Sequence, residues 1–142
     1  KERDEAVGLV HTGKGLEIDE LAQGIPDNLF EFILFDACYM ASIECVYELR
    51  HKTNYILASP TETMGEGWPY SNIISLLFAN NLQLDLVGKT FYDYYNQKSG
   101  DWRTATVSLT QTKALDELAN IVREILADKK ERALGKYIVT FD

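Results

Sequence analysis

An apolar run that ends abruptly in Asp-x-Cys is the feature that most constrains this chain. The run extends from Phe30 to Phe35, Asp36 and Cys38 follow it, and residues 39–50 repeat apolar side chains at helical spacing. Strands buried on both faces of a parallel sheet show such runs, and open α/β folds bind ligands where these strands end. We therefore predict a strand over 30–36, a helix over 39–50, and a functional site between them.

The patterns along the rest of the chain predict an α/β domain. A second buried strand over 55–59 completes a right-handed βαβ unit. Other helices are expected over 16–24, 71–79, 84–97 and 115–130, a third strand over 104–110, and either a short strand or a loop over 6–10. The loop over 61–70 contains two glycines and follows a strand, which is where such folds place substrate contacts.

Size and charge narrow the functional classes. The chain has 142 residues, which favours a single domain over 1–142, and its net charge is -8. An acidic chain without a basic block is a poor partner for nucleic acid or an anionic membrane, but it tolerates a basic peptide. No apolar run is long enough to span a bilayer. Residues 138–142 look like part of a strand, so we expect both ends to be cuts inside a larger protein.

Cys38 has two interpretations from its position. It could be a nucleophile, because a helix beginning near Tyr39 or Met40 would place its positive end beside the thiolate that attack requires, and the Cys38 N–H could serve an oxyanion hole. It could equally be a small buried side chain at a strand end. Cys45 is expected to pack in the core. On one helix the two cysteines would be about ten ångströms apart, too far for a disulfide, and no Cys/His metal cluster is present.

Three other residues, Asp36, Trp68 and His11, also admit two roles each. Asp36 shares a side of the strand with Cys38 and could contact a cationic substrate, or it could cap a local N–H. Trp68 could line a pocket or staple the next helix. His11 precedes a glycine-containing turn and could be a catalytic base or an ordinary loop histidine. His51 lies at a basic helix end, which favours a surface role.

Several blocks of this sequence together resemble the clostripain family of cysteine peptidases. These blocks are Phe32–Glu44, Val46–Arg50, Tyr55–Glu62 and Gly65–Tyr70, and Leu16–Leu21 is similar to the family's segment before the catalytic strand. The resemblance is dense from Gly15 to Tyr70 and extends over the rest only in outline. It implies a caspase-like three-layer fold, with a mostly parallel sheet flanked by helices, which is incomplete in this chain.

The resemblance also implies roles for individual residues. Cys38 would be the nucleophile of a His–Cys dyad, and Asp36 would line the primary specificity pocket and favour Arg or Lys before the scissile bond. Thr61 or Thr63 would face Asp36 across that pocket, with Trp68 in the same substrate-binding loop. Neither metal nor organic cofactor is needed for this chemistry, although acidic loops could bind calcium weakly.

The catalytic histidine is where the sequence departs from the family pattern. The family's histidine sits in a His-Gly motif well before the Leu16–Leu21 segment, whereas His11 is followed by Thr12 and lies close to that segment. We expect the true base to lie in an N-terminal part of the same gene product, with His11 as the candidate inside this chain. The alternative is a catalytically incomplete, peptidase-like domain that binds peptides or proteins. A nucleotide-binding domain is disfavoured because no glycine-rich phosphate loop follows a strand.

The resemblance further implies autoprocessing after a basic residue into two chains that stay together. It also implies a bacterial protein that is secreted, periplasmic or held at the cell surface. The expected partners are a peptide or protein substrate with a basic residue and the N-terminal part of the gene product. This piece alone would be inactive or very weak without a general base.

Overall fold

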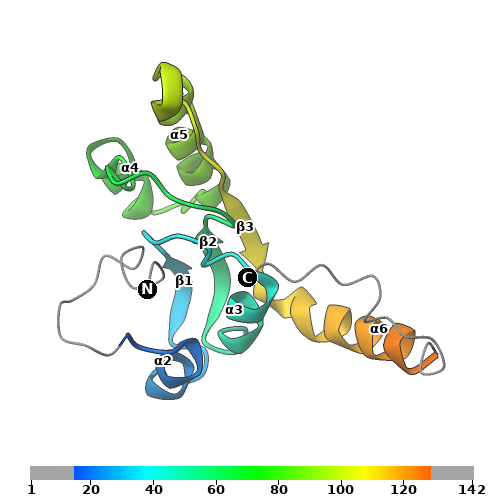
Figure 1. Cartoon of the computed structure of the whole chain (residues 1–142). Coiled ribbons are helices and arrows are strands. Elements are labelled where there is room, and N and C mark those ends of the chain that lie inside the picture. Colours follow the sequence, from blue (N-terminus) through cyan, green and yellow to red (C-terminus); the bar gives the residue numbers. More distant parts are fainter. Residues whose placement is uncertain (1–14, 129–142) are drawn as a thin grey trace.

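A computed structural model describes residues 15–128, in which three strands form one sheet in the order β1-β2-β3 (Figure 1). Strand β1 (Phe30–Leu34) pairs in parallel with β2 (Thr53–Ala58), and β2 pairs antiparallel with β3 (Ser108–Gln111). Helix α3 (Ile43–Glu48) connects the two parallel strands, as the strand–helix–strand pattern predicts. The predicted α/β class, a sheet flanked by helices, is confirmed.

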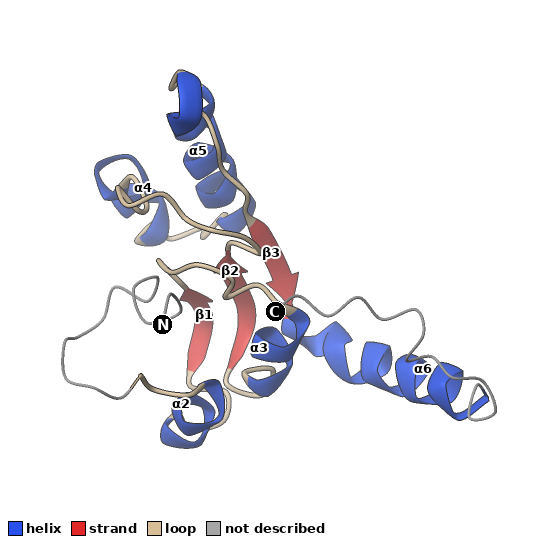
Figure 2. Ribbon diagram, in the orientation of Figure 1, coloured by secondary structure: helices blue, strands red, loops and turns tan. Residues whose placement is uncertain are grey.

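Alternating side chains of β2 supply a hydrophobic core on each face of the sheet. Ile56 and Ala58 belong to one core, which they share with α2 (Ile18–Gly24) and α3, whereas Leu57 belongs to the other core. Helices α4 (Tyr70–Leu77) and α5 (Leu84–Asn96) cover that second core (Figure 2). Each fully buried aliphatic side chain stabilises the fold by about 1.5–3 kcal/mol. The result is a three-layer arrangement, helices–sheet–helices, centred on β2.

The segment between β1 and α3 differs from the prediction. Strand β1 ends at Leu34 rather than at residue 36, and the helix begins at Ile43 rather than at Tyr39. Tyr39 has φ +62°, a left-handed conformation that cannot start a right-handed helix. Instead Ser42 caps the helix, where its side chain accepts the N–H of Cys45 at 3.4 Å.

The position of Cys38 changes accordingly. It lies in a turn five residues before α3, so the expectation that the helix N-terminus lies beside its thiol is wrong. Cys38 and Cys45 do not share a helix, and both are free thiols. The described contacts of the Cys38 thiol come from the loop after β2 rather than from a helix end.

The C-terminal part of the described chain contains short elements and one long helix. Two single 3-10 turns, η1 (Gly100–Trp102) and η2 (Thr112–Ala114), flank β3, which is shorter than the predicted strand over 104–110. Helix α6 (Leu115–Asp128) follows. Three predictions lie outside the described residues: the short strand or loop over 6–10, the strand-like segment 138–142, and the role of His11.

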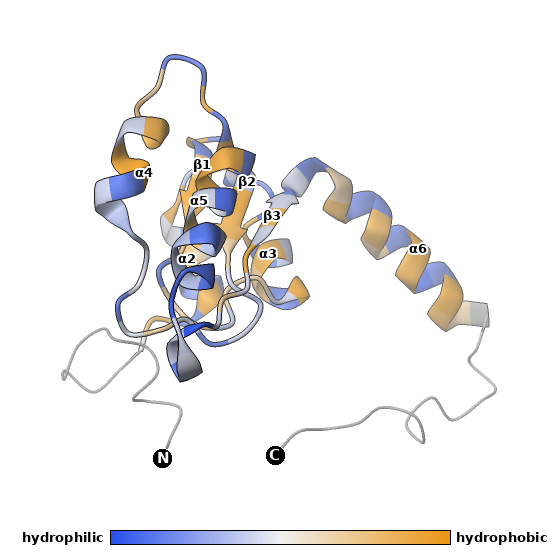
Figure 3. Ribbon diagram, turned by 90° about the horizontal axis from the view of Figure 1, so that it is seen from above, coloured by the Kyte–Doolittle hydropathy of each residue, from blue (hydrophilic) through white to orange (hydrophobic). Residues whose placement is uncertain are grey.

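Helix α6 extends away from the sheet and has one apolar face (Figure 3). The large apolar side chains of this face are 42–49% exposed; they are Leu118, Ile121, Val122, Ile125 and Leu126. Near its start the helix is fixed to the turn after α3 by an ion pair between Arg50 and Asp116 with an N···O distance of 2.8 Å. Within residues 15–128, no helix is long and apolar enough to cross a membrane.

Candidate active site

The segment after β1 and the loop after β2 lie against each other at one edge of the sheet. Their strands are parallel, so both strands end at this edge. Three backbone N–H···O bonds join the segment after β1 to β2 and its loop, from Phe35 to Leu57 (3.0 Å), from Tyr39 to Thr61 (3.0 Å) and from Ala41 to Ser59 (3.1 Å). These bonds fix the turn that contains Asp36 and Cys38 against the loop over 59–69.

The Cys38 sulfur contacts the backbone of Thr63. The Thr63 N–H donates to Sγ at 3.2 Å, and Sγ lies 3.8 Å from the Thr63 carbonyl oxygen. The Thr63 hydroxyl donates to the Ala37 carbonyl at 3.4 Å, which holds Thr63 in place beside the turn. These contacts hold the Cys38 sulfur against the backbone of the loop after β2.

The carboxylate of Asp36 lies two residues before Cys38 and receives two donors from the loop after β2. Its Oδ2 accepts the Trp68 backbone N–H at 3.4 Å and the Tyr70 hydroxyl at 3.1 Å. Burial, with a smaller effect of the neighbouring Asp36 charge, raises the pKa of Tyr70, so this phenol stays a neutral donor. Among the described residues, no lysine, arginine or histidine forms an ion pair with Asp36. Its negative charge therefore remains available to a cationic ligand.

Trp68 anchors the loop rather than presenting its ring to solvent. Its side chain is 3% exposed and packs on Phe91 of α5 with ring centroids 4.2 Å apart. The indole N–H donates to the Phe35 carbonyl at 3.0 Å. The ring therefore belongs to the second core, and only the backbone N–H of Trp68 reaches Asp36.

Helix α5 holds the same loop at a second place. The Tyr95 hydroxyl donates to the Gly67 carbonyl at 2.7 Å, and burial raises the pKa of Tyr95 to about 12. Glu66 accepts the Lys98 ammonium at 2.7 Å and the Tyr94 hydroxyl at 2.8 Å. The hydrogen bond from Lys98 lowers the pKa of Glu66, which keeps this carboxylate charged. The backbone that faces Asp36 is thus positioned from α5.

The hydroxyl of Thr61 is directed elsewhere. It lies 2.6 Å from the hydroxyl of Thr106, which in turn lies 2.7 Å from that of Ser59. The implied place of Thr61 or Thr63 across a specificity pocket from Asp36 stays a prediction; among the described residues, the side-chain hydroxyl that donates to Asp36 is that of Tyr70. The sequence did not predict that Tyr70 contacts Asp36. It also did not predict that Thr106 contacts Ser59 and Thr61.

No histidine of the described residues lies beside Cys38. His51 is the one histidine between residues 15 and 128, and it sits in the turn before β2, at the opposite end of that strand from the site. His11 lies outside this range, so its predicted role stays a prediction. In the same range, no group of three His, Cys, Asp or Glu side chains could hold a metal ion.

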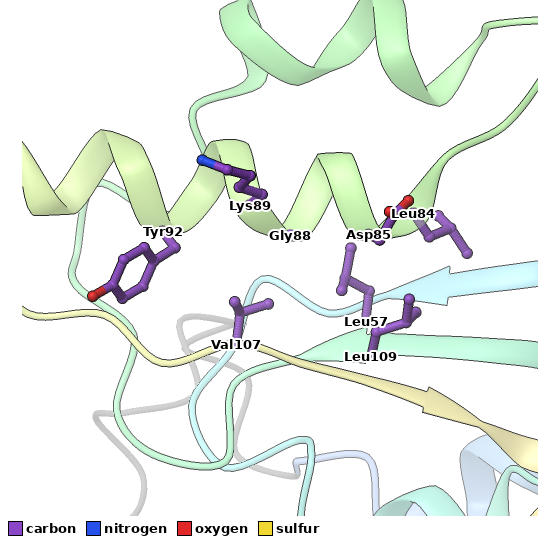
Figure 4. Close-up of a pocket in the computed structure, with 8 residues that line it drawn as sticks. All are labelled: Leu57, Leu84, Asp85, Gly88, Lys89, Tyr92, Val107 and Leu109. Atoms are coloured by element: carbon purple, nitrogen blue, oxygen red, sulfur yellow. The ribbon is translucent and has the colours of Figure 1, made fainter.

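A cavity of about 320 Å³ lies between α5 and the sheet, away from these residues (Figure 4). It is lined by Leu57, Leu84, Asp85, Gly88, Lys89, Tyr92, Val107 and Leu109. Its walls are mostly apolar, and none of the predicted site residues contributes to them. The site at the sheet edge is therefore defined by the contacts of Asp36 and Cys38 rather than by this hollow.

Comparisons with known proteins find one family model and several solved structures that are similar to this chain. The Clostripain family model matches residues 9–139. A clostripain from Bacteroides thetaiotaomicron ATCC 29148, solved with a peptide inhibitor, has a TM-score of 0.74 and 34% identity, covering 83% of this chain and 52% of its own. An inactive zymogen C11 protease from Parabacteroides distasonis has a TM-score of 0.65 and 38% identity, with coverages of 73% and 29%.

A secreted C11 cysteine protease from Bacteroides thetaiotaomicron, iotapain, has a TM-score of 0.70 and 27% identity, covering 90% of this chain and 39% of its own. The chain thus spans about half the length, or less, of these solved structures. No curated protein matches the chain.

Proposed function

This chain belongs to the clostripain family of peptidases, and from that premise we propose that it carries the nucleophile of a cysteine endopeptidase that cleaves after Arg or Lys. One observation supports the proposal above all. Cys38 and the Asp36 carboxylate, which has no ion-pair partner among residues 15–128, lie on a single turn at the sheet edge, with one residue between them. The proposed nucleophile and the carboxylate proposed to select a basic substrate residue thus lie in one short segment.

Cys38 supplies the covalent step. Its thiolate attacks the carbonyl carbon of the scissile bond, the tetrahedral intermediate expels the amine as a histidine protonates it, and a thioester remains. Water, deprotonated by the same histidine, then hydrolyses the thioester and regenerates the thiol. The Cys38 backbone N–H is our candidate donor to the oxyanion. The Tyr39 N–H is already engaged by the Thr61 carbonyl.

The histidine of this mechanism comes from outside the described residues. His11 is one source, and the N-terminal part of the same gene product is the other. A histidine delivered by another segment suits a protein activated by processing, and one relative is described as an inactive zymogen. Another relative, iotapain, is described as a secreted protease. From this likeness we propose that the protein acts outside the bacterial cytoplasm.

Asp36 supplies the selectivity. No lysine, arginine or histidine of residues 15–128 forms an ion pair with this carboxylate, so its charge can attract the ammonium of lysine or the guanidinium of arginine. The clostripain from Bacteroides thetaiotaomicron was solved with an inhibitor written BTN-VLTK-AOMK, whose peptide ends in lysine. That inhibitor is consistent with the same charge preference in this chain.

A binding role without catalysis is the second candidate function. It is favoured by one observation, that no histidine within residues 15–128 lies beside Cys38. A peptidase-like domain of this kind would still bind basic peptides through Asp36. The two functions differ in whether a peptide bond is broken.

The test uses the longest gene product that contains this chain. Three fluorogenic peptides are compared, which differ only in the residue before the scissile bond: Lys, Arg or Glu. Each is incubated with the unsubstituted protein and with the variants Cys38→Ala, Asp36→Asn and Cys45→Ala. We expect cleavage of the two basic peptides only, complete loss in Cys38→Ala, and a fall of about 100-fold in kcat/KM in Asp36→Asn through loss of the ion pair. Cys45→Ala removes the other free thiol, seven residues away, and keeps full activity.

Each other result rejects part of the proposal. Activity that survives in Cys38→Ala rejects Cys38 as the nucleophile. Cleavage after Glu as fast as after Lys rejects Asp36 as the selective group. Binding of a basic peptide without cleavage by the folded full-length protein supports the second function. Loss of activity in His11→Ala, with an unchanged fold, would assign the base to His11.

A further inference from the structure

The two oxygens of the Asp36 carboxylate have unequal surroundings. Oδ2 accepts both the Trp68 N–H and the Tyr70 hydroxyl, at 3.4 Å and 3.1 Å. Oδ1 accepts no hydrogen bond from the described residues. A carboxylate oxygen has two lone-pair sites, so both sites of Oδ2 have a donor, whereas Oδ1 has none among the described residues and the backbone of Gly67 approaches it.

Lysine and arginine use a carboxylate differently. The guanidinium of arginine presents a planar fork that binds best when it donates to both oxygens at once. The ammonium of lysine is a compact charge that needs only one oxygen. A carboxylate with Oδ2 already occupied therefore favours the lysine side chain over the arginine side chain.

We propose that Tyr70, through its hydrogen bond to Oδ2 of Asp36, sets a preference for lysine over arginine in the substrate. This inference rests on the proposed function, because it assigns the choice within the class of basic substrates. Of the two donors on Oδ2, the Trp68 N–H belongs to the backbone. Tyr70 is thus the donor that can differ between related proteins or be removed by substitution.

The position of Tyr70 suits this role. It is the first residue of α4, its N–H bonds the Trp68 carbonyl at 2.8 Å, and Pro69 precedes it, so its backbone is held. Its side chain is 48% exposed, which leaves the ring within reach of an entering substrate. The raised pKa of Tyr70 keeps the hydroxyl protonated and able to donate at neutral pH.

The test compares two matched peptides, with Lys or Arg before the scissile bond, in the full-length protein. The unsubstituted protein is expected to cleave the Lys peptide with the higher kcat/KM. Tyr70→Phe removes only the hydroxyl, frees one site on Oδ2, and should raise the Arg-to-Lys ratio of kcat/KM about tenfold. Tyr92→Phe, which removes a half-exposed tyrosine hydroxyl on α5 away from Asp36, should leave the ratio unchanged.

The ratio separates a specific effect from a structural one, because a damaged fold lowers cleavage of both peptides together. An unchanged ratio in Tyr70→Phe, or faster cleavage of the Arg peptide by the unsubstituted protein, overturns the inference and leaves the proposed function standing. If the unsubstituted protein cleaves neither peptide, the proposed protease function fails, and this inference fails with it.

Discussion

A β-carbon at Gly67 would lie 2.5 Å from Oδ2 and 2.7 Å from Oδ1 of Asp36. Gly67 also has φ +64°, a conformation that side chains disfavour. The close approach of this backbone lets the next residue, Trp68, donate its N–H to the carboxylate. Position 67 is therefore constrained twice, by its own conformation and by the carboxylate that it faces.

Gly67→Ala should displace the Asp36 carboxylate and strain the loop. We expect a loss of about 1–2 kcal/mol in unfolding free energy from the left-handed conformation, and a fall of at least about tenfold in kcat/KM for the Lys peptide. Gly65→Ala is the control, since a β-carbon there meets nothing within 4 Å and its φ is not positive. Thermal unfolding and steady-state kinetics test both, and equal behaviour of the two variants would contradict the close contact.

Tyr95→Phe should loosen the same loop from the side of α5. The change leaves the Gly67 carbonyl without the hydroxyl that lies 2.7 Å away, which costs about 1–2 kcal/mol. The folded protein holds the proton of Tyr95 more tightly than the unfolded chain does, because its pKa is raised from 10.0 to about 12. The stabilisation by Tyr95 is therefore complete below pH 10 and declines as the pH rises toward 12. Denaturant unfolding at pH 8 and pH 11 should show a smaller difference between the two proteins at pH 11.

Glu66→Gln should remove a pH-dependent contribution to stability. The pKa of Glu66 lies below its ordinary value of 4.5 in the folded protein, chiefly because of the hydrogen bond from Lys98. The contribution is thus present above pH 4.5 and is lost as the pH falls through the folded pKa. The difference in Tm from the unsubstituted protein should shrink between pH 7 and pH 3.5.

Thr106→Val should weaken the link between the loop after β2 and the segment before β3. The hydroxyl of Thr106 lies within 2.7 Å of those of both Ser59 and Thr61, and Ser59 is buried. Losing these contacts should cost about 1–2 kcal/mol, whereas Thr104→Val, at an exposed threonine with no hydrogen bond in the described structure, should cost little. Equal unfolding free energies for the two variants would show that the cluster contributes nothing.

Much of the scaffold could be predicted because its signals are local. The apolar run before Asp36 and the apolar residues of β2 predict buried strands, and helical periodicity predicts the helix between them. The positions of Asp36 and Cys38 follow, since a parallel strand places what comes after it at the carboxyl edge.

The turn between β1 and α3 could not be predicted in the same way. Tyr39 is not a residue that signals a left-handed conformation, and its backbone is held by the Thr61 carbonyl from the other strand's loop. The contacts of Tyr70 and Thr106 likewise depend on segments brought together by folding, 34 and 45 residues away from their partners Asp36 and Thr61. Motif spacing and residue propensity describe neighbours along the chain, so they do not predict contacts between residues this far apart in sequence.

The turn that holds Asp36 and Cys38 contains both within three consecutive residues, fixed by backbone bonds to β2 and its loop. With the roles proposed above, one short peptide would carry both charge recognition and nucleophilic attack, while the proton-transfer partner would come from elsewhere. Peptide binding and peptide cleavage could then be lost independently in evolution. A descendant without the histidine would keep the carboxylate proposed to bind basic peptides, so a protease of this kind could give rise to a peptide receptor through a change that leaves this turn untouched.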